Sequence, residues 1–203
     1  MPRVVDREKK RDCLVQAASA VFATQGFSGT RMADIAARAG VGKGTVYEYF
    51  DSKEELFLAV FQWINMGIAR RINDRLASKG SARAQLEAIF DESATIIADL
   101  RDVSSLNLDF WAACRGSAFE GRFKEALEAL YDEYRGLVAG IIQGGQETGE
   151  FRKGLDPYSL AAALVGTFDG LGVQNWIDDS IDLASAASSF TTVVLSGLSV
   201  KKA

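Results

Sequence analysis

The chain has 203 residues, a net charge of −4 and the composition of a soluble globular protein, with 48% hydrophobic and 25% charged residues. This length allows one large domain or two small ones, and only two prolines among many Ala, Leu and Ile residues favour helices. The chain has no histidine and no CxxC spacing, which argues against a disulfide framework and a zinc site of Cys and His, and it removes the usual general base of a hydrolase. We predict no metal site, no cofactor and no catalytic residue.

Charge is divided unevenly along the chain. Residues 1–50 hold eight Lys or Arg and five Asp or Glu, whereas the remainder holds 15 and 22. A basic N-terminal segment followed by an acidic remainder is expected when the N-terminal segment binds a polyanion, although chance explains so small an imbalance equally well. The first residues, "MPRVVDREKKRD", lack the apolar segment of a secretory signal, and no apolar run is long enough to span a membrane, so a cytoplasmic protein is expected.

The first predicted helix begins near Arg7 and ends at Gly26, where glycine can adopt the left-handed conformation and Phe27 can fold back. Its apolar residues recur with helical spacing at Leu14, Ala17, Ala18, Val21 and Phe22. Thr30 is expected to cap a short second helix that Gly40 ends. Val46 and Phe50 anchor a third, and Ser52 with Glu55 starts a fourth. Short helices joined by a glycine turn are typical of a helix-turn-helix.

Longer helices are expected beyond Ser52. The first of them ends at about Leu76, the second runs from Ala82 to about Leu100, and a short third lies within residues 102–121. The fourth runs from Arg122 to Gln143. The fifth begins with a cap at Asp156 and Pro157 in its first turn, and the last runs from about Leu183 to Leu195. The segment "GGQETGEFRKGLDP" between the fourth and fifth of these is predicted as a loop. No strand alternation persists, so the fold class is all-α.

Small residues recur every fourth position in the helix after Asp156, at Ala162, Gly166 and Gly170. Glycine inside a helix costs about 1 kcal/mol relative to alanine, so close packing against another helix must compensate. That partner is either a helix of the same chain or the same helix in a second copy.

The stretch "VGKGTVYEYF", residues 41–50, allows two interpretations. A nucleotide-binding P-loop needs G-x-x-x-x-G-K-[ST] after a buried strand, and "GVGKGT" imitates its end. Ala37 occupies the first glycine position, however, and the preceding residues have helical spacing, which argues against a phosphotransferase.

As a recognition helix, the same stretch presents Lys43 and Gly44 at its tip for base contacts, and the hydroxyls of Thr45, Tyr47 and Tyr49 for phosphates. Glu48 either accepts from cytosine or turns toward Lys43 or Lys53. The alternative is an all-helical interaction module without specific DNA binding, in which Tyr47 and Tyr49 are core aromatics.

The segment from Gly29 to Phe57, "GTRMADIAARAGVGKGTVYEYFDSKEELF", resembles the signature of the TetR family of transcriptional regulators. The resemblance implies a three-helix DNA-binding domain in residues 1–52 and a larger ligand-binding and dimerisation domain in residues 53–203. It implies a ligand-responsive regulator rather than an enzyme: a repressor that binds a palindromic DNA operator as a homodimer and is released by a small-molecule effector.

Carried over by position, the resemblance implies phosphate contacts from Thr30, Thr45, Tyr47, Tyr49 and Lys53, and base contacts from Lys43 and Gly44 assisted by Ala33 and Glu48. It implies nonspecific phosphate attraction from Arg7, Lys9, Lys10 and Arg11. The implied dimer interface comprises Leu160, Leu164, Gly166, Gly170, Leu171, Phe190 and Val194. Candidate effector-pocket residues are Trp63, Asn107, Phe110, Trp111, Arg115 and Phe168, with core packing as the alternative for each.

Overall fold

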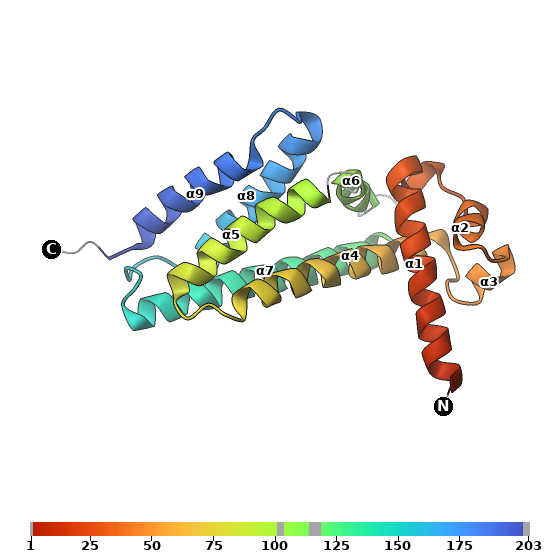
Figure 1. Ribbon diagram of the computed structural model, residues 1–203, viewed down its shortest axis with the longest axis horizontal. Coiled ribbons are helices and arrows are strands. Elements are labelled where there is room, and N and C mark those ends of the chain that lie inside the picture. Colours follow the sequence, from red (N-terminus) through yellow and green to blue (C-terminus); the bar gives the residue numbers. More distant parts are fainter. Residues whose placement is uncertain (1, 101–103, 114–118, 201–203) are drawn as a thin grey trace. The chain divides into compact units, whose positions relative to one another are not determined.

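The computed structural model describes residues 2–100, 104–113 and 119–200, and these ranges are helical throughout apart from short connections and one isolated bridge between Phe151 and Ser199 (Figure 1). The helices are α1 (Pro2–Gly29), α2 (Met32–Ala39), α3 (Lys43–Tyr47), α4 (Lys53–Leu76), α5 (Ala82–Asp99), α6 (Ser104–Ala113), α7 (Glu120–Thr148), α8 (Pro157–Ile177) and α9 (Leu183–Leu198). The all-α prediction is confirmed, with a helix-turn-helix at the N-terminus.

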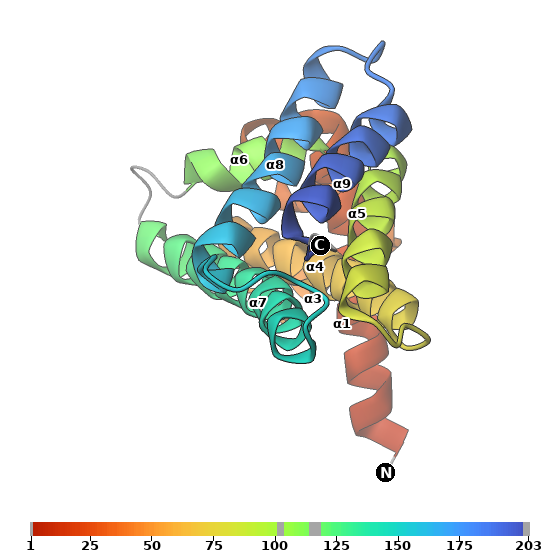
Figure 2. The ribbon, with the colours of Figure 1, turned by 90° about the vertical axis from the view of Figure 1, so that its left-hand side faces the viewer.

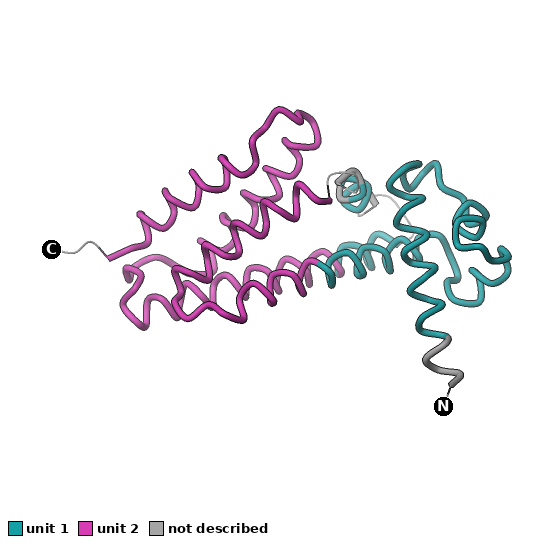
Figure 3. The backbone as a smooth tube through the Cα atoms, in the orientation of Figure 1, with its two compact units in different colours: residues 1–67, 105–125 teal, residues 68–104, 126–203 magenta. Residues whose placement is uncertain are grey.

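The chain forms two compact units (Figure 3). Unit 1 comprises residues 1–67 and 105–125, and unit 2 comprises residues 68–104 and 126–203. Unit 1 therefore contains α1 to α3, the first part of α4, and α6. This division follows packing, whereas the predicted boundary after residue 52 concerns function and stays a prediction.

The apolar stripe of α1 is buried as predicted and packs on α2. Gly26, at φ 68° and ψ 169°, interrupts α1, which only glycine does without strain. The break turns Phe27 back, so that its ring lies 6.0 Å from Phe22 and 4.6 Å from Phe57.

The predicted cap of α2 is wrong. Arg31 occupies the capping position, and its N–H donates to the Asp34 carboxylate at 3.0 Å. The Thr30 side chain is buried instead, and its hydroxyl donates to the carbonyl of Gly26 at 2.7 Å. The Thr30 side chain thus contacts the kinked end of α1 and does not cap α2.

α4 begins as its sequence predicts. Glu55 N–H donates to the Ser52 hydroxyl at 3.1 Å, and the Glu55 carboxylate reaches back to the N–H of Asp51 at 2.8 Å. One turn later, the Phe57 ring stacks on Phe110 of α6 with centroids 4.1 Å apart, and its edge meets Phe22 of α1 at 4.9 Å. This aromatic cluster is the centre of unit 1.

In unit 2, α5 packs against both α8 and α9 (Figure 2). The core consists of apolar side chains from α5, α7, α8 and α9 together with the end of α4. Its most buried members are Leu86, Phe90, Ile142, Phe151, Ala161, Leu164, Leu195 and Leu198.

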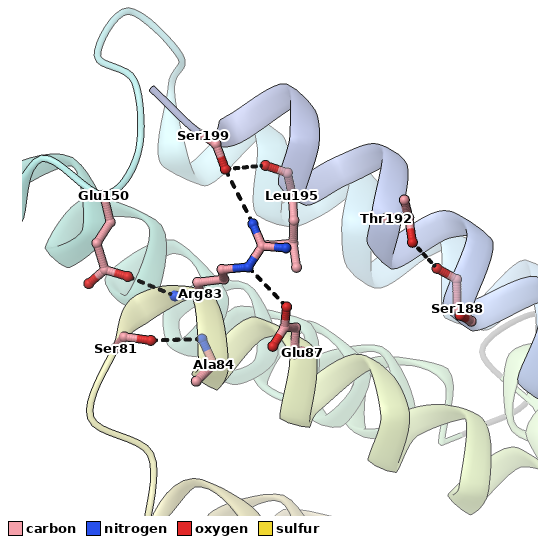
Figure 4. Close-up of polar contacts among 9 residues, drawn as sticks. All are labelled: Ser81, Arg83, Ala84, Glu87, Glu150, Ser188, Thr192, Leu195 and Ser199. Atoms are coloured by element: carbon pink, nitrogen blue, oxygen red, sulfur yellow. Dashed lines mark hydrogen bonds and ion pairs between the residues drawn. The ribbon is translucent and has the colours of Figure 1, made fainter. Parts of the chain in front are cut away.

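The α7–α8 connection joins three helices of unit 2. The Glu150 carboxylate accepts from the N–H groups of Ala82 and Arg83, both at 3.2 Å, and so caps the first turn of α5. The Arg83 guanidinium in turn reaches Glu87 at 3.1 Å and the Ser199 hydroxyl at 3.3 Å (Figure 4). The carbonyl of Leu198 accepts from Arg152 N–H at 2.8 Å, which fixes the end of α9.

The predicted loop at residues 144–157 begins too early, because α7 continues to Thr148. Two glycines of this segment, Gly144 and Gly145, belong to α7, and Gly145 is there for a packing reason. At Gly145 the missing side chain leaves room for the Phe151 ring, which would overlap any Cβ there. The following helix begins as predicted, with the Asp156 carboxylate accepting from Ser159 N–H at 2.7 Å and Pro157 in the first turn.

Candidate nucleic-acid interface

α3 turns its apolar side inward. Val46 is fully buried and Phe50, just after the helix, is 1% exposed. These two residues leave the opposite side of α3 to solvent, where Lys43, Gly44, Tyr47 and Glu48 are all exposed. Thr45 and Tyr49 are half-buried at the edges of this surface. The predicted inward and outward sides of the recognition helix are thus the observed ones.

The N-terminal end of α3 is accessible to another molecule and carries one cationic side chain, Lys43. A Cβ on Gly44 would meet no atom within 4 Å, so another molecule can approach its backbone closely. The Lys43 ammonium lies 5.6 Å from the centre of the Tyr47 ring. The Tyr47 hydroxyl and the Lys43 ammonium therefore belong to one surface.

Glu48 makes no ion pair in the part of the chain that the structure describes. Lys43 lies over Tyr47, and the Lys53 ammonium donates to the carbonyls of Phe27 and Thr30 at 2.7 and 3.0 Å. The intrachain pairing of Glu48 with either lysine is therefore not observed, and its carboxylate faces solvent.

The remaining residues predicted to contact DNA lie in different surroundings. Ala33 is exposed on α2. Thr30 and Lys53 serve the chain itself: the Thr30 hydroxyl is turned to Gly26, and Lys53 lies over the Phe27 ring, 4.3 Å from its centre. We assign both side chains to the framework that holds the α1–α2 connection.

The turn between α2 and α3 distinguishes the two interpretations of the glycine-lysine stretch. Residues 32–39 form α2, and Gly40 ends it at φ 68° and ψ 30°. A P-loop requires a strand at this place. The described residues around Lys43 thus have the helix-turn-helix arrangement and lack the strand of a nucleotide-binding loop.

Comparison with known proteins agrees with this geometry. Residues 14–60 match the family described as "Bacterial regulatory proteins, tetR family", and residues 82–197, more than half of the chain, match "BetI-type transcriptional repressor, C-terminal". The chain belongs to the tetR family. It is a ligand-responsive, DNA-binding transcriptional regulator.

Two curated relatives cover nearly the whole regulator. The fatty acid metabolism regulator protein of Bacillus subtilis is 28% identical over 190 residues, which span 91% of this chain and 93% of that protein. The transcriptional repressor KstR2 of Rhodococcus jostii is 27% identical over 191 residues, spanning 93% and 91%.

Solved structures share the fold of this tetR-family chain. A Saccharomonospora viridis regulator in complex with choline superposes with a TM-score of 0.82 at 22% identity, covering 96% of this chain and all of that one. FadR of Bacillus subtilis in complex with stearoyl-CoA gives a TM-score of 0.77 at 24% identity, covering 92% and 98%. No helix within the described ranges is long and apolar enough to cross a membrane.

The candidate effector residues that the structure describes are divided between the two units: Trp63, Phe110 and Trp111 belong to unit 1, and Phe168 belongs to unit 2. Phe110 is 2% exposed and stacks on Phe57 inside unit 1, whereas Phe168 packs on Phe90 in unit 2, 5.5 Å between centroids. Trp63 and Trp111 are 37% and 38% exposed. Arg115 and the side chain of Asn107 lie outside the described residues. Core packing thus accounts for the two phenylalanines.

The predicted dimer residues mostly face the core of unit 2. Leu164 belongs to that core, and Leu160, Phe190 and Val194 are partly buried against it. Leu171 and Gly170 are half-buried, and Gly166 is exposed. The large hydrophobic side chains that α8 and α9 expose are Tyr158, Trp176, Ile177 and Val193. Helical period alone does not distinguish an apolar side that faces the core from one that faces solvent or a partner, so the sequence did not indicate that these four are exposed.

Proposed function

We propose that this regulator is a repressor that binds a palindromic operator as a homodimer, reading each half-site with the exposed surface of α3. The observation that carries the proposal is the inward anchoring of Val46 and Phe50, which leaves Lys43, Gly44 and Tyr47 together on one open surface. A lysine can donate to the guanine acceptors of the major groove, and the open backbone at Gly44 allows close approach.

Around that tip, hydroxyls suit phosphate oxygens. Thr45, Tyr47 and Tyr49 supply three of them at or beside the exposed surface. Such contacts fix the register of the helix on DNA without reading bases. Ala33 and Glu48 complete the proposed base-contacting set: the alanine offers an apolar contact, and the solvent-facing carboxylate an acceptor for cytosine N4.

A salt titration tests the interface. Binding of the DNA upstream of the coding sequence is measured by fluorescence anisotropy at several salt concentrations. We expect Tyr47→Phe to weaken binding to operator and unrelated duplexes by a similar factor, and Lys43→Ala to lower discrimination by about 1–3 kcal/mol. Affinity without salt dependence, or full discrimination by Lys43→Ala, would contradict the assignment.

The proposed dimer surface is the outward face of α8 and α9. α9 has no charged residue between Leu183 and Leu198, and α8 has one, Asp169. Uncharged surfaces that expose aromatic and aliphatic side chains are typical of homodimer interfaces. A two-fold dimer also supplies two reading heads, which must lie about 34 Å apart to enter successive major grooves.

Light scattering tests this surface. Val193 is 71% exposed, and we expect Val193→Arg to shift the protein from dimer to monomer and to weaken operator binding. Ala129→Arg, on an exposed position of the charged helix α7, is the matched control and should leave the dimer intact. A wild-type protein that is monomeric at micromolar concentration would disprove the dimer.

We propose further that the effector carries a fatty acyl chain. The supporting observation is the relationship to the fatty acid metabolism regulator protein of Bacillus subtilis, which is 28% identical over 190 residues. Adding stearoyl-CoA to the protein–DNA complex should release the DNA. An effector lowers the affinity for DNA to the extent that it binds the DNA-free conformation more tightly than the DNA-bound one. Choline serves as the comparison ligand. If choline releases the DNA and stearoyl-CoA does not, the effector is a quaternary ammonium compound and not a fatty acyl compound.

A further inference from the structure

The side of α1 that packs on the helix-turn-helix changes chemistry along its length. From Leu14 onward its residues are apolar and buried. In the preceding turns the same side carries Arg7, Lys10 and Arg11, which are all exposed. At about 100° per residue these three positions lie within about 60° of Leu14 around the helix axis. The acidic residues Glu8 and Asp12 lie on other sides of the helix.

Two of these cations rest on the connection that follows the recognition helix. The Arg7 guanidinium carbon lies 5.6 Å from the centre of the Tyr49 ring, and that of Arg11 lies 5.1 Å from the centre of the Phe50 ring. Both distances are within the range of a cation–π contact. Two arginines one turn apart on α1 thus make cation–π contacts with two consecutive aromatic residues.

The held residues have different roles in the interface. Phe50 is an interior anchor, 1% exposed, whereas Tyr49 is half-buried and is proposed to bind phosphate. Arg7 therefore restricts the orientations of the Tyr49 ring and places a permanent positive charge over it. Because a guanidinium stacked on a ring keeps its N–H donors at its edge, Arg7 can still donate to phosphate.

We propose that the first turns of α1 are a second DNA-contacting element, in which Arg7 orients Tyr49 and, together with Lys10, binds backbone phosphates beside those bound by α3. This rests on the proposed function of α3. Figure 1 shows these turns extending beyond α2 and α3 within unit 1. The partner is a DNA backbone, because an ordered row of cations next to phosphate-binding hydroxyls matches a regularly spaced polyanion.

Salt dependence distinguishes an ordered contact from diffuse attraction. Affinity is measured for the DNA upstream of the coding sequence and for a random duplex of equal length. Arg7→Ala should weaken binding to both duplexes roughly threefold to tenfold and reduce the slope of log affinity against log salt by about 0.9, the loss of one phosphate. Arg7→Lys should restore the slope.

Lys9 is the matched control. It is exposed and lies about 140° from Leu14 around the helix, so Lys9→Ala removes the same charge from a different side of α1. We expect Lys9→Ala to change the slope by less than a third as much as Arg7→Ala or Lys10→Ala does. Equal effects of all three variants would mean diffuse attraction and would overturn the proposal.

A double-mutant cycle tests the positioning of Tyr49. In a Tyr49→Leu background, Arg7→Ala should cost at least twofold less affinity than in the wild type, since the ring that Arg7 orients is gone. Fully additive losses would remove the positioning role. If wild-type affinity depends steeply on salt and Tyr47→Phe weakens it, an unchanged slope for Arg7→Ala refutes this inference alone. A flat slope for the wild type refutes the proposed interface as well.

Discussion

The carboxylate of Asp109 accepts a hydrogen bond from the N–H of Phe27 at 2.8 Å, across 82 residues of sequence. Asp109 belongs to α6, and Phe27 follows the glycine that breaks α1. A side chain of α6 thus accepts from the backbone at the break in α1. The α1–α2 connection, which positions the helix-turn-helix, is therefore fixed in part by a helix distant in sequence.

Removing this acceptor should destabilise unit 1. We expect Asp109→Ala to lower the free energy of unfolding by about 1–3 kcal/mol, the cost of leaving a partly buried N–H unsatisfied. Asp109→Asn keeps an oxygen acceptor and should cost less. Urea unfolding followed by circular dichroism gives both values. Equal stability of Asp109→Ala and the wild type would show that water replaces the carboxylate.

A substitution of Lys53 distinguishes a structural role of this side chain from a contact with DNA. Its ammonium donates to two carbonyls of the α1–α2 connection. Lys53→Met keeps the apolar stem and removes the donor, so the free energy of unfolding should fall by about 1.5–3 kcal/mol. The slope of log affinity for DNA against log salt should stay unchanged, because the framework role leaves Lys53 no phosphate contact. A slope reduced by about 0.9 would show that Lys53 does contact a phosphate, as the family resemblance implies. Lys9→Met is the control for loss of an exposed charge.

Two adjacent glycines of α7 should respond in opposite directions to the same substitution. A Cβ at Gly145 would overlap the Phe151 ring and lie 2.9 Å from the Cβ of Ala82, whereas a Cβ at Gly144 would meet nothing within 4 Å. Gly145→Ala should therefore destabilise the protein by about 1–3 kcal/mol through overpacking. Gly144→Ala should stabilise it by about 0.5–1 kcal/mol through helix propensity. Thermal unfolding of the two variants checks the pair; a stabilising Gly145→Ala would show that Phe151 moves aside.

Burial raises the pKa of Asp169, although the hydrogen bond from the Tyr131 hydroxyl, 2.9 Å away, acts in the opposite direction. Folding thus favours the protonated carboxyl. The stability that this group contributes is present below its ordinary pKa of 3.8 and is lost as pH rises through the folded pKa. Asp169→Asn should therefore stabilise the protein at neutral pH and lose this advantage as pH falls below the ordinary pKa. Urea unfolding at a series of pH values checks this, and a pH-independent difference between the variants would contradict it.

Much of the fold was predictable because its signals are local. Gly40 ends α2, Ser52 starts α4, and Asp156 with Pro157 starts α8, each through backbone groups within four residues. The inward sides of α1 and α3 followed from helical period for the same reason. The end of α7 was predicted too early, because two glycines resemble a loop until Phe151 is seen packed on one of them.

The sequence by itself determined the all-α class, the helix-turn-helix at the N-terminus and the outward surface of α3, since these depend on spacing and on capping within a few residues. Only the tertiary structure decided that Thr30 and Lys53 face the chain, that Leu164 lies in the core while Val193 is exposed, and that Arg7 lies over Tyr49. Most of these outcomes depend on contacts between residues more than twenty positions apart, and helical period does not specify which neighbour an apolar or charged side chain will meet.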